Sequence, residues 1–476
     1  MNRPCRLWYI FKVNRKGGSG MKTNLKELVV DLKLPYLRSL LLIALIPLFP
    51  EYISFVLAIG AFIFARQDIR QQNKRIHLGT IGKLLLIYCS YMTLTCFFSN
   101  YKLQCGAAAA MWWFFFFVYV VVVNLLTDED RLDAFLMCIT AVAGVIGLIA
   151  CIQYRLNFFV DNNYGSVWRW LDELVFPLIP FNMTLSIYQI RAYSTFPNPN
   201  MLAQYLVMVV PFVTCFNFIE RRQELRLFSR ICLFLTFAGI LFSFSRGGYL
   251  ALLVLSIALI VLNIRHRFSA VTLYVVSALL FLPEEVMTRL ISVHDGVTSS
   301  SIIAETVLGS IDSTVPLDST SEIIANASSD VAVSERWEIW FEAIKRIFER
   351  PFFGYGVGTE PTANMMEQIG VSSPHAHNIV LQLLLEGGIF ALVLMCLIGF
   401  QTIKYGFSLF RRGYTASFWV GFAILAFAVG FLLHGMVDYP LTTPRLICCF
   451  VTVLGIVEQS VDIYSNRRPP SKVLQK

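Results

Sequence analysis

The sequence contains few charged residues for its length. Only 15% of its 476 residues are Asp, Glu, Lys or Arg, whereas 56% are hydrophobic. Because a soluble domain carries about a quarter charged residues, this deficit indicates a chain that is surrounded mostly by lipid. The net charge of +8 is no argument for nucleic-acid binding. The basic residues lie in short loops between apolar runs, which is typical of membrane orientation signals.

The cysteines form no pattern that binds zinc or cross-links an extracellular domain. Most of the 11 lie within apolar runs, where a thiol behaves as a small hydrophobe. There is no CxxC motif, and the long polar segments at 154–198 and 284–376 contain no cysteine. We therefore expect neither a structural zinc site nor a disulfide framework.

Apolar runs recur along the chain at lengths that suit a membrane-spanning helix, which needs about 20 apolar residues. About twelve such runs predict an all-α integral membrane protein. Their approximate bounds are 37–49, 50–66, 82–98, 106–125, 132–153, 199–219, 230–245, 248–264, 268–283, 377–400, 416–435 and 444–460.

The distribution of Lys and Arg predicts the orientation of these helices. Five segments that follow every second helix are clearly basic, and only the short loop at 128–131 is neutral to acidic, so both termini are expected in the cytoplasm. Five regions result: a cytoplasmic segment at 1–36, nine helices within 37–283 with an outer loop at 154–198, a large extracytoplasmic loop at 284–376, three helices within 377–460, and a cytoplasmic tail at 461–476.

The end of the large outer loop has the pattern of an amphipathic helix at 334–350. Ser334 is a suitable N-cap, and Pro351 is expected to end the helix. Apolar residues recur at three- and four-residue spacing, which predicts an apolar face that lies on the membrane surface or covers a cavity. This face comprises Val333, Trp337, Trp340, Phe341, Ile344, Ile347 and Phe348.

Two histidines close the large loop. His375 and His377 are the only close pair among six histidines, and His434 lies at the outer end of the eleventh predicted span. Imidazole is the side chain best suited to accept a proton near neutral pH, so His377 is a candidate general base. The alternative that His377 caps a helix or anchors at the membrane interface is about equally compatible with the spacing. Metal binding is less favoured, because no cysteine or carboxylate stands beside the pair in the sequence.

Two arginines lie in turns on the same predicted face. Arg246 is part of a Ser-Arg-Gly-Gly turn between two spans, and Arg191 directly precedes the sixth span. Guanidinium groups bind phosphate oxygens in pairs, which suits a diphosphate. The alternative is that each arginine contacts lipid headgroups. Asn200 is expected to cap the sixth helix first and to bind a ligand second.

In chain order, the motifs are RAYSTFPNPN at 191–200, SRGG at 245–248, RWEIW at 336–340 with GYG at 354–356, and HN at 377–378. Together they resemble the O-antigen ligase and polymerase superfamily of bacterial membrane glycosyltransferases. The family pattern begins with His and a small polar residue, followed after nine residues by Gly and after two more by a second Gly. His377, Asn378 and Gly388 match this pattern, but Ala391 replaces the second Gly. Ser194 also stands where Gly is common.

The resemblance implies a GT-C-like fold and a metal-independent, inverting transfer of a glycan from undecaprenyl diphosphate to a hydroxyl acceptor, with no cofactor. Arg191 and Arg246 would hold the diphosphate, and His377 would deprotonate the acceptor. The acceptor remains open between a glycan, a lipid and a protein hydroxyl, and so does the choice between ligase and polymerase. Candidate substrate-binding residues are Arg336, His375, Asn378, Asn200 and Ser245.

A secondary transporter or a flippase for lipid-linked oligosaccharides is the alternative class. Such proteins usually consist of related halves with polar sites near the membrane midplane. Here no repeat is visible, the spans carry few charges, and the polar motifs gather on one predicted face. The transferase interpretation is therefore favoured.

The start of the chain yields a separate prediction. Residues 1–20 are basic and lack the apolar core of a signal peptide, whereas Met21 begins a conventional start after Lys16-Gly17-Gly18, which a purine-rich ribosome-binding site could encode. We expect translation to begin at Met21. N-terminal sequencing of the native protein should give Met21 or Lys22, and a sequence that begins at Met1 would contradict this.

Overall fold

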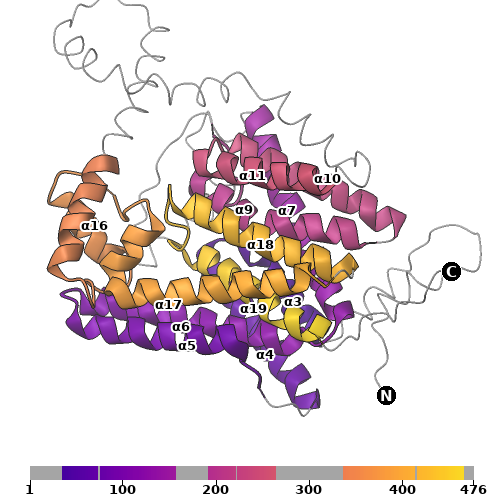
Figure 1. Cartoon of the computed structure of the whole chain (residues 1–476), viewed down its shortest axis with the longest axis horizontal. Helices are drawn as coiled ribbons and strands as arrows, with labels where there is room; N and C mark the ends of the chain where they lie inside the picture. The colour runs from indigo at the N-terminus through magenta and orange to yellow at the C-terminus, as the bar shows by residue number, and fades with distance from the viewer. Residues whose placement is uncertain are drawn as a thin grey trace, which may run out of the picture.

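The computed structural model describes residues 35–72, 76–156, 191–220, 222–263, 336–371, 373–412 and 415–465. All regular elements in these ranges are helices, which confirms the all-α class (Figure 1). They are α3 (Pro35–Leu45), η1 (Ile46–Leu48), α4 (Glu51–Gln72), α5 (Gly79–Thr95), η2 (Cys96–Phe98), α6 (Lys102–Leu125), α7 (Glu129–Leu156), α9 (Pro199–Ile219), α10 (Gln223–Phe242), α11 (Arg246–Asn263), α16 (Thr359–Glu367), α17 (Ile379–Phe410), α18 (Thr415–Gly435) and α19 (Pro444–Ser465). A further helix covers 336–349.

Nine helices of the described part are long and apolar enough to cross a membrane, and α3 and α11 are shorter apolar helices. Together they coincide with all the predicted spans except 268–283. That segment lies outside the described residues, so the total of about twelve spans stays a prediction.

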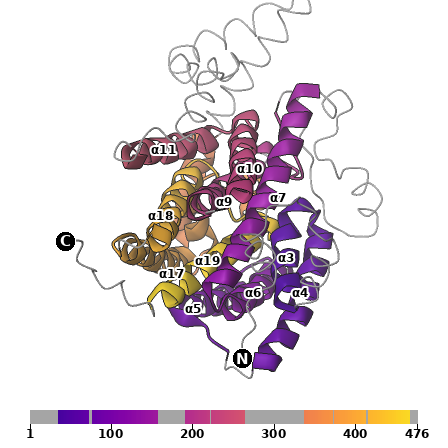
Figure 2. The ribbon, with the colours of Figure 1, turned by 90° about the vertical axis from the view of Figure 1, so that its right-hand side faces the viewer.

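Helices α9 and α19 form the centre of the bundle. Helix α9 packs against α7, α10 and α18, and α19 packs against α6 and α17 (Figure 2). Both are buried along most of their length, which agrees with their place at the centre. Helix α4 instead exposes Val56, Ile59 and Phe62, which suits contact with lipid.

Arg445 fixes several chain segments at one end of the bundle. Its Nη1 donates hydrogen bonds to the carbonyl oxygens of Phe49, at 3.1 Å, and of Thr195, at 2.7 Å. Its guanidinium also lies 4.7 Å from the centre of the Phe196 ring. The buried arginine thus ties the start of α19 to the α3–α4 turn and to the segment before α9.

Helix α17 is interrupted at Gly388, whose φ of 64° lies in the left-handed region. The residues around Gly354 supply the hydrogen bonds that the break removes. The Tyr355 N–H donates to the Leu385 carbonyl at 2.7 Å, and the Ile389 N–H donates to the Pro351 carbonyl at 2.8 Å. The break therefore fixes the first part of α17 to the chain that follows helix 336–349.

The amphipathic helix predicted at 334–350 is confirmed over 336–349, and it ends before Pro351. Ser334 and Val333 lie outside the described residues. Phe341 and Phe348 of the predicted apolar face are 76% and 80% exposed. A second face with Ile339 and Ala343 packs against the protein. The predicted face is therefore divided: Phe341 and Phe348 point away from the protein, where they can contact the membrane surface, whereas Trp340 and Ile347 pack against the protein.

The break in α17 leads to a stability prediction. In Gly388→Ala the added Cβ would overlap the Phe352 carbonyl oxygen in a backbone conformation that alanine disfavours. We expect a loss of about 1–3 kcal/mol, measured as a lower midpoint of thermal unfolding in detergent with a thiol-reactive dye. Gly399→Ala is the matched control, because Gly399 lies in the same helix with open space around its Cα. Equal midpoints for the two variants would contradict the prediction.

Candidate functional site

His377 occupies a special backbone position directly before α17. Its φ of 48° lies in the left-handed region, and its N–H donates to Nδ1 of His375 at 3.3 Å. The next residue, Asn378, caps the helix by accepting from the N–H groups of Val380 and Leu381. The alternative that His377 itself caps α17 is therefore wrong, and its side chain is available for other contacts.

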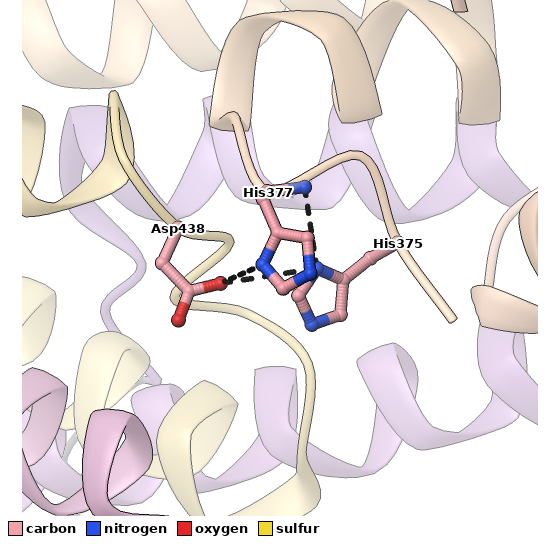
Figure 3. A group of neighbouring side chains, drawn as sticks. All are labelled: His375, His377 and Asp438. Atoms are coloured by element: carbon pink, nitrogen blue, oxygen red, sulfur yellow. Dashed lines mark hydrogen bonds and ion pairs between the residues drawn. The ribbon is translucent and has the colours of Figure 1, made fainter. Parts of the chain in front are cut away.

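Asp438, in the connection between α18 and α19, is the partner of this side chain. Its Oδ1 lies 3.0 Å from Nδ1 of His377 (Figure 3). Burial by itself would raise the pKa of the Asp438 carboxyl, but the hydrogen bond from His377 and the charges of the neighbouring histidines hold it well below its ordinary value. A carboxylate at Nδ1 favours the tautomer in which Nε2 of His377 carries the lone pair that accepts a proton.

His375 supports this pair from a buried position. The centroid of its ring lies 4.2 Å from the centroid of the His377 ring, and its Nδ1 lies 3.8 Å from Oδ1 of Asp438. Burial lowers the pKa of His375 to about 3, helped by the repulsion that a protonated His377 and Arg336 would exert on a second positive charge. His375 is therefore neutral at ordinary pH. Arg336, the first described residue of helix 336–349, faces the site closely enough to contribute to this shift.

These three side chains also offer ligand atoms of the type that metals prefer. Nitrogen and oxygen atoms of His375, His377 and Asp438 lie within 4.8 Å of one another. The sequence-based argument against a metal was that no carboxylate stands beside the histidines, and Asp438 overturns this premise. Both Nδ1 atoms are engaged in the hydrogen bonds described above, so only an ion bound through Nδ1 would have to replace these bonds. Metal-independence remains a prediction.

A buried network holds the histidine segment from behind. The Ala376 N–H donates to Oε1 of Gln382 at 2.9 Å, and the Ala376 carbonyl accepts from Nε1 of Trp340 at 2.9 Å. Gln382 donates in turn to Glu386, which also accepts from the hydroxyl of Tyr439. The spans were expected to carry almost no buried charge, and the buried carboxyl group of Glu386 is an exception.

The turn at 245–248 packs directly on the end of α18. Oγ of Ser245 lies 3.3 Å from Nε2 of His434. Any Cβ on Gly247 would overlap Val437 and crowd the ring of His434, so only glycine permits this approach. Arg246 is exposed and is the first residue of α11.

Arg191 joins the first motif to this turn. Its Nε donates to the Ser243 carbonyl at 2.9 Å, and its Nη2 donates to Oδ1 of Asn200 at 2.6 Å. The Ala192 N–H also donates to the Phe242 carbonyl. Two arginine motifs that are far apart in the sequence therefore lie side by side.

The predicted cap of the sixth span was wrong. Oδ1 of Asn198 accepts from the Asn200 N–H at 2.7 Å, so Asn198 is the N-cap of α9. Asn200 binds Arg191 instead. Asn378 contributes a second contact besides its cap, because its Nδ2 donates to the Met436 carbonyl at 3.1 Å.

The sequence did not lead to a role for Asp438 or to the contact between His434 and Ser245. The available signal was that Asp438 follows His434 by four residues and lies in a short connection between two apolar runs. An ionisable residue at a membrane boundary is a candidate for function. Nothing local indicates that Asp438 meets His377.

Comparison with known proteins relates part of the chain to one family. Residues 231–396 match the sequence profile of the family described as O-antigen ligase. This range includes the turn at 245–248 and both histidines of the 375–377 segment. A ComP-specific O-oligosaccharyltransferase of Acinetobacter baylyi is 32% identical over 114 residues. The match covers 22% of this chain and 19% of that protein, so the aligned part is about a fifth of each.

The low pKa of His375 predicts an acid-dependent loss of stability. Below the ordinary pKa of 6.5 the unfolded chain binds a proton that the folded protein, with a pKa of about 3, does not. His375 should therefore destabilise the fold as pH falls from 6.5 to 3, by at most about 1.4 kcal/mol per pH unit. His375→Asn keeps an acceptor for the His377 N–H but does not titrate. As pH is lowered, the midpoint of thermal unfolding should fall less steeply in this variant than in the wild type. If the two midpoints fell in parallel with pH, the low pKa of His375 in the folded protein would be contradicted.

Proposed function

We propose that the chain is a member of the O-antigen ligase superfamily, whose profile matches residues 231–396, and that it is a membrane glycosyltransferase that moves a glycan from undecaprenyl diphosphate to a hydroxyl acceptor. The observation that carries this proposal is the hydrogen bond between His377 and Asp438, next to a turn that presents Arg246. A carboxylate-supported histidine beside arginines suits deprotonation of a hydroxyl and stabilisation of a departing phosphate.

His377 is the proposed general base. Its Nε2 takes the proton of the acceptor hydroxyl while the oxygen attacks the anomeric carbon. The bond from this carbon to the diphosphate breaks, and undecaprenyl diphosphate leaves with the bonding electrons. One direct displacement inverts the anomeric configuration and requires no covalent intermediate. Asp438 keeps the proton-accepting nitrogen oriented and stabilises the imidazolium that forms.

Arg191 and Arg246 are the proposed partners of the diphosphate. Their motifs are joined through the Ser243 carbonyl, which supports a common binding region. Arg336 is proposed to position sugar or phosphate from helix 336–349. The contacts of Asn200, Ser245, Asn378 and His375 within the protein favour indirect roles, in which these residues hold the groups that touch substrate.

We place the protein in the bacterial cytoplasmic membrane with both termini in the cytoplasm and the site on the extracytoplasmic face. The basic loops predicted on the inner side support this orientation. An undecaprenyl-linked donor can approach such a site from the surrounding lipid. The acceptor is a hydroxyl group of a glycan, a lipid or a protein.

Transport of a lipid-linked oligosaccharide is the competing function. A reconstituted assay separates it from transfer: purified protein in liposomes receives an undecaprenyl-diphosphate oligosaccharide, and products are resolved by size. A ladder of longer lipid-linked chains would identify a polymerase. Turnover only after an acceptor is added would identify a ligase. Folded protein that consumes no donor in either format would contradict the proposal and favour transport.

In this assay His377→Ala should lower the rate by about 10²–10⁴-fold, because proton transfer in the transition state is lost. His77→Ala is the matched histidine control. His77 lies just before α5, away from the site. Its side chain is about half exposed and pairs with Asp462. Its replacement should leave the rate unchanged. Equal rates for the two variants would remove His377 from the mechanism.

Addition of EDTA tests the expected independence from metals. His375, His377 and Asp438 lie close enough together to share an ion, so the test addresses this cluster directly. We expect an unchanged rate after chelation and dialysis. A rate that falls with EDTA and returns with a divalent cation would show that His375, His377 and Asp438 bind a metal instead.

A further inference from the structure

His434 is a buried polar residue that the proposed chemistry does not use. It lies in the last turn of α18 and is 1% exposed. Its Nε2 contacts Oγ of Ser245 at 3.3 Å, and its Nδ1 is buried with no hydrogen-bond partner in the described protein. A residue that only filled space here would be better replaced by an apolar one, because a buried nitrogen without a partner is costly.

The position of His434 connects the two halves of the site. Its ring packs on Gly247, next to Arg246. Its backbone carbonyl accepts from the N–H of Asp438 at 3.0 Å, and Asp438 binds His377. The side chain of His434 therefore touches the turn that carries the proposed phosphate-binding arginine, and its carbonyl holds the backbone of Asp438, whose carboxylate orients the proposed base.

The contact with Ser245 is the specific part of this connection. Oγ of Ser245 also accepts a weak hydrogen bond from the Gly248 N–H at 3.4 Å, so the hydroxyl is fixed at the start of α11. A hydroxyl held in this way can donate to Nε2 of His434. The pair then sets how far the Arg246 turn stands from the end of α18.

We infer that His434 is a positioning residue for glycan transfer, which holds the Arg246 turn at a fixed distance from the His377–Asp438 pair through its contact with Ser245. The inference rests on the proposed function. His434 touches neither reacting atom in this account, so its loss should weaken use of the lipid-linked donor without changing how the rate depends on pH.

Three substitutions separate this role from simple packing. In His434→Gln the side-chain amide places a polar atom near the position of Nε2, so it can still contact Ser245. In His434→Asn the shorter side chain extends only to the position of Nδ1, so this contact is lost. Ser245→Ala removes the other partner. In the reconstituted assay, His434→Asn and Ser245→Ala should each lower kcat/KM for the donor by about 10-fold, mainly through KM. His434→Gln should stay within about 3-fold of the wild-type value.

The double variant His434→Asn/Ser245→Ala completes the test. If the two side chains act through one contact, the double variant should lose no more than either single variant. Independent losses that multiply to about 100-fold would overturn the inference. So would a His434→Gln protein as impaired as His434→Asn, or a shifted pH–rate profile, which would make His434 a proton-transfer group.

Folding is checked with the thermal midpoint of each variant. If His434→Asn does not fold, Ser245→Ala still tests the contact from the other side, and wild-type kinetics for Ser245→Ala would overturn the inference. Failure of the proposed function looks different: wild-type protein then consumes no donor at all. If the wild type is active and the variants have wild-type kinetics, only the positioning role of His434 is contradicted.

Discussion

The hydrogen bond between His377 and Asp438 is the contact on which the rest of the site depends. It joins the start of α17 to the connection between α18 and α19. Each partner is held separately, because the Asn378 cap and His375 fix the conformation of His377, while the His434 carbonyl fixes Asp438. A buried carboxylate is tolerated only with such partners, so the chemistry and the local fold require the same contact.

Other polar contacts extend from this pair through the same end of the bundle. Ser245 meets His434 beside Asp438, and Arg191 reaches both Ser243 and Asn200. In a protein surrounded by lipid, polar groups must find partners inside the protein. This constraint explains why motifs scattered over more than half of the chain gather in one place.

The sequence was sufficient to predict the helices and several site residues, since apolar runs and helical spacing are local signals. It could not predict the pairing of His377 with Asp438, because that contact depends on how α17 and α18 pack. The cap of α9 was assigned to the wrong asparagine although a local rule was available. Proline favours the first helical position, so Pro199 indicates that Asn198, directly before it, is the cap. The pair Gly387-Gly388 is a local signal for a kink, but the hydrogen bonds that stabilise the break come from a distant segment that local spacing does not reveal.

The most direct test of this account is an experimental structure with undecaprenyl diphosphate bound in a lipid environment. The account predicts that the diphosphate lies against Arg246 and Arg191, with the end that would carry the glycan directed towards Nε2 of His377. A diphosphate bound at another end of the bundle, or out of reach of both arginines, would contradict it.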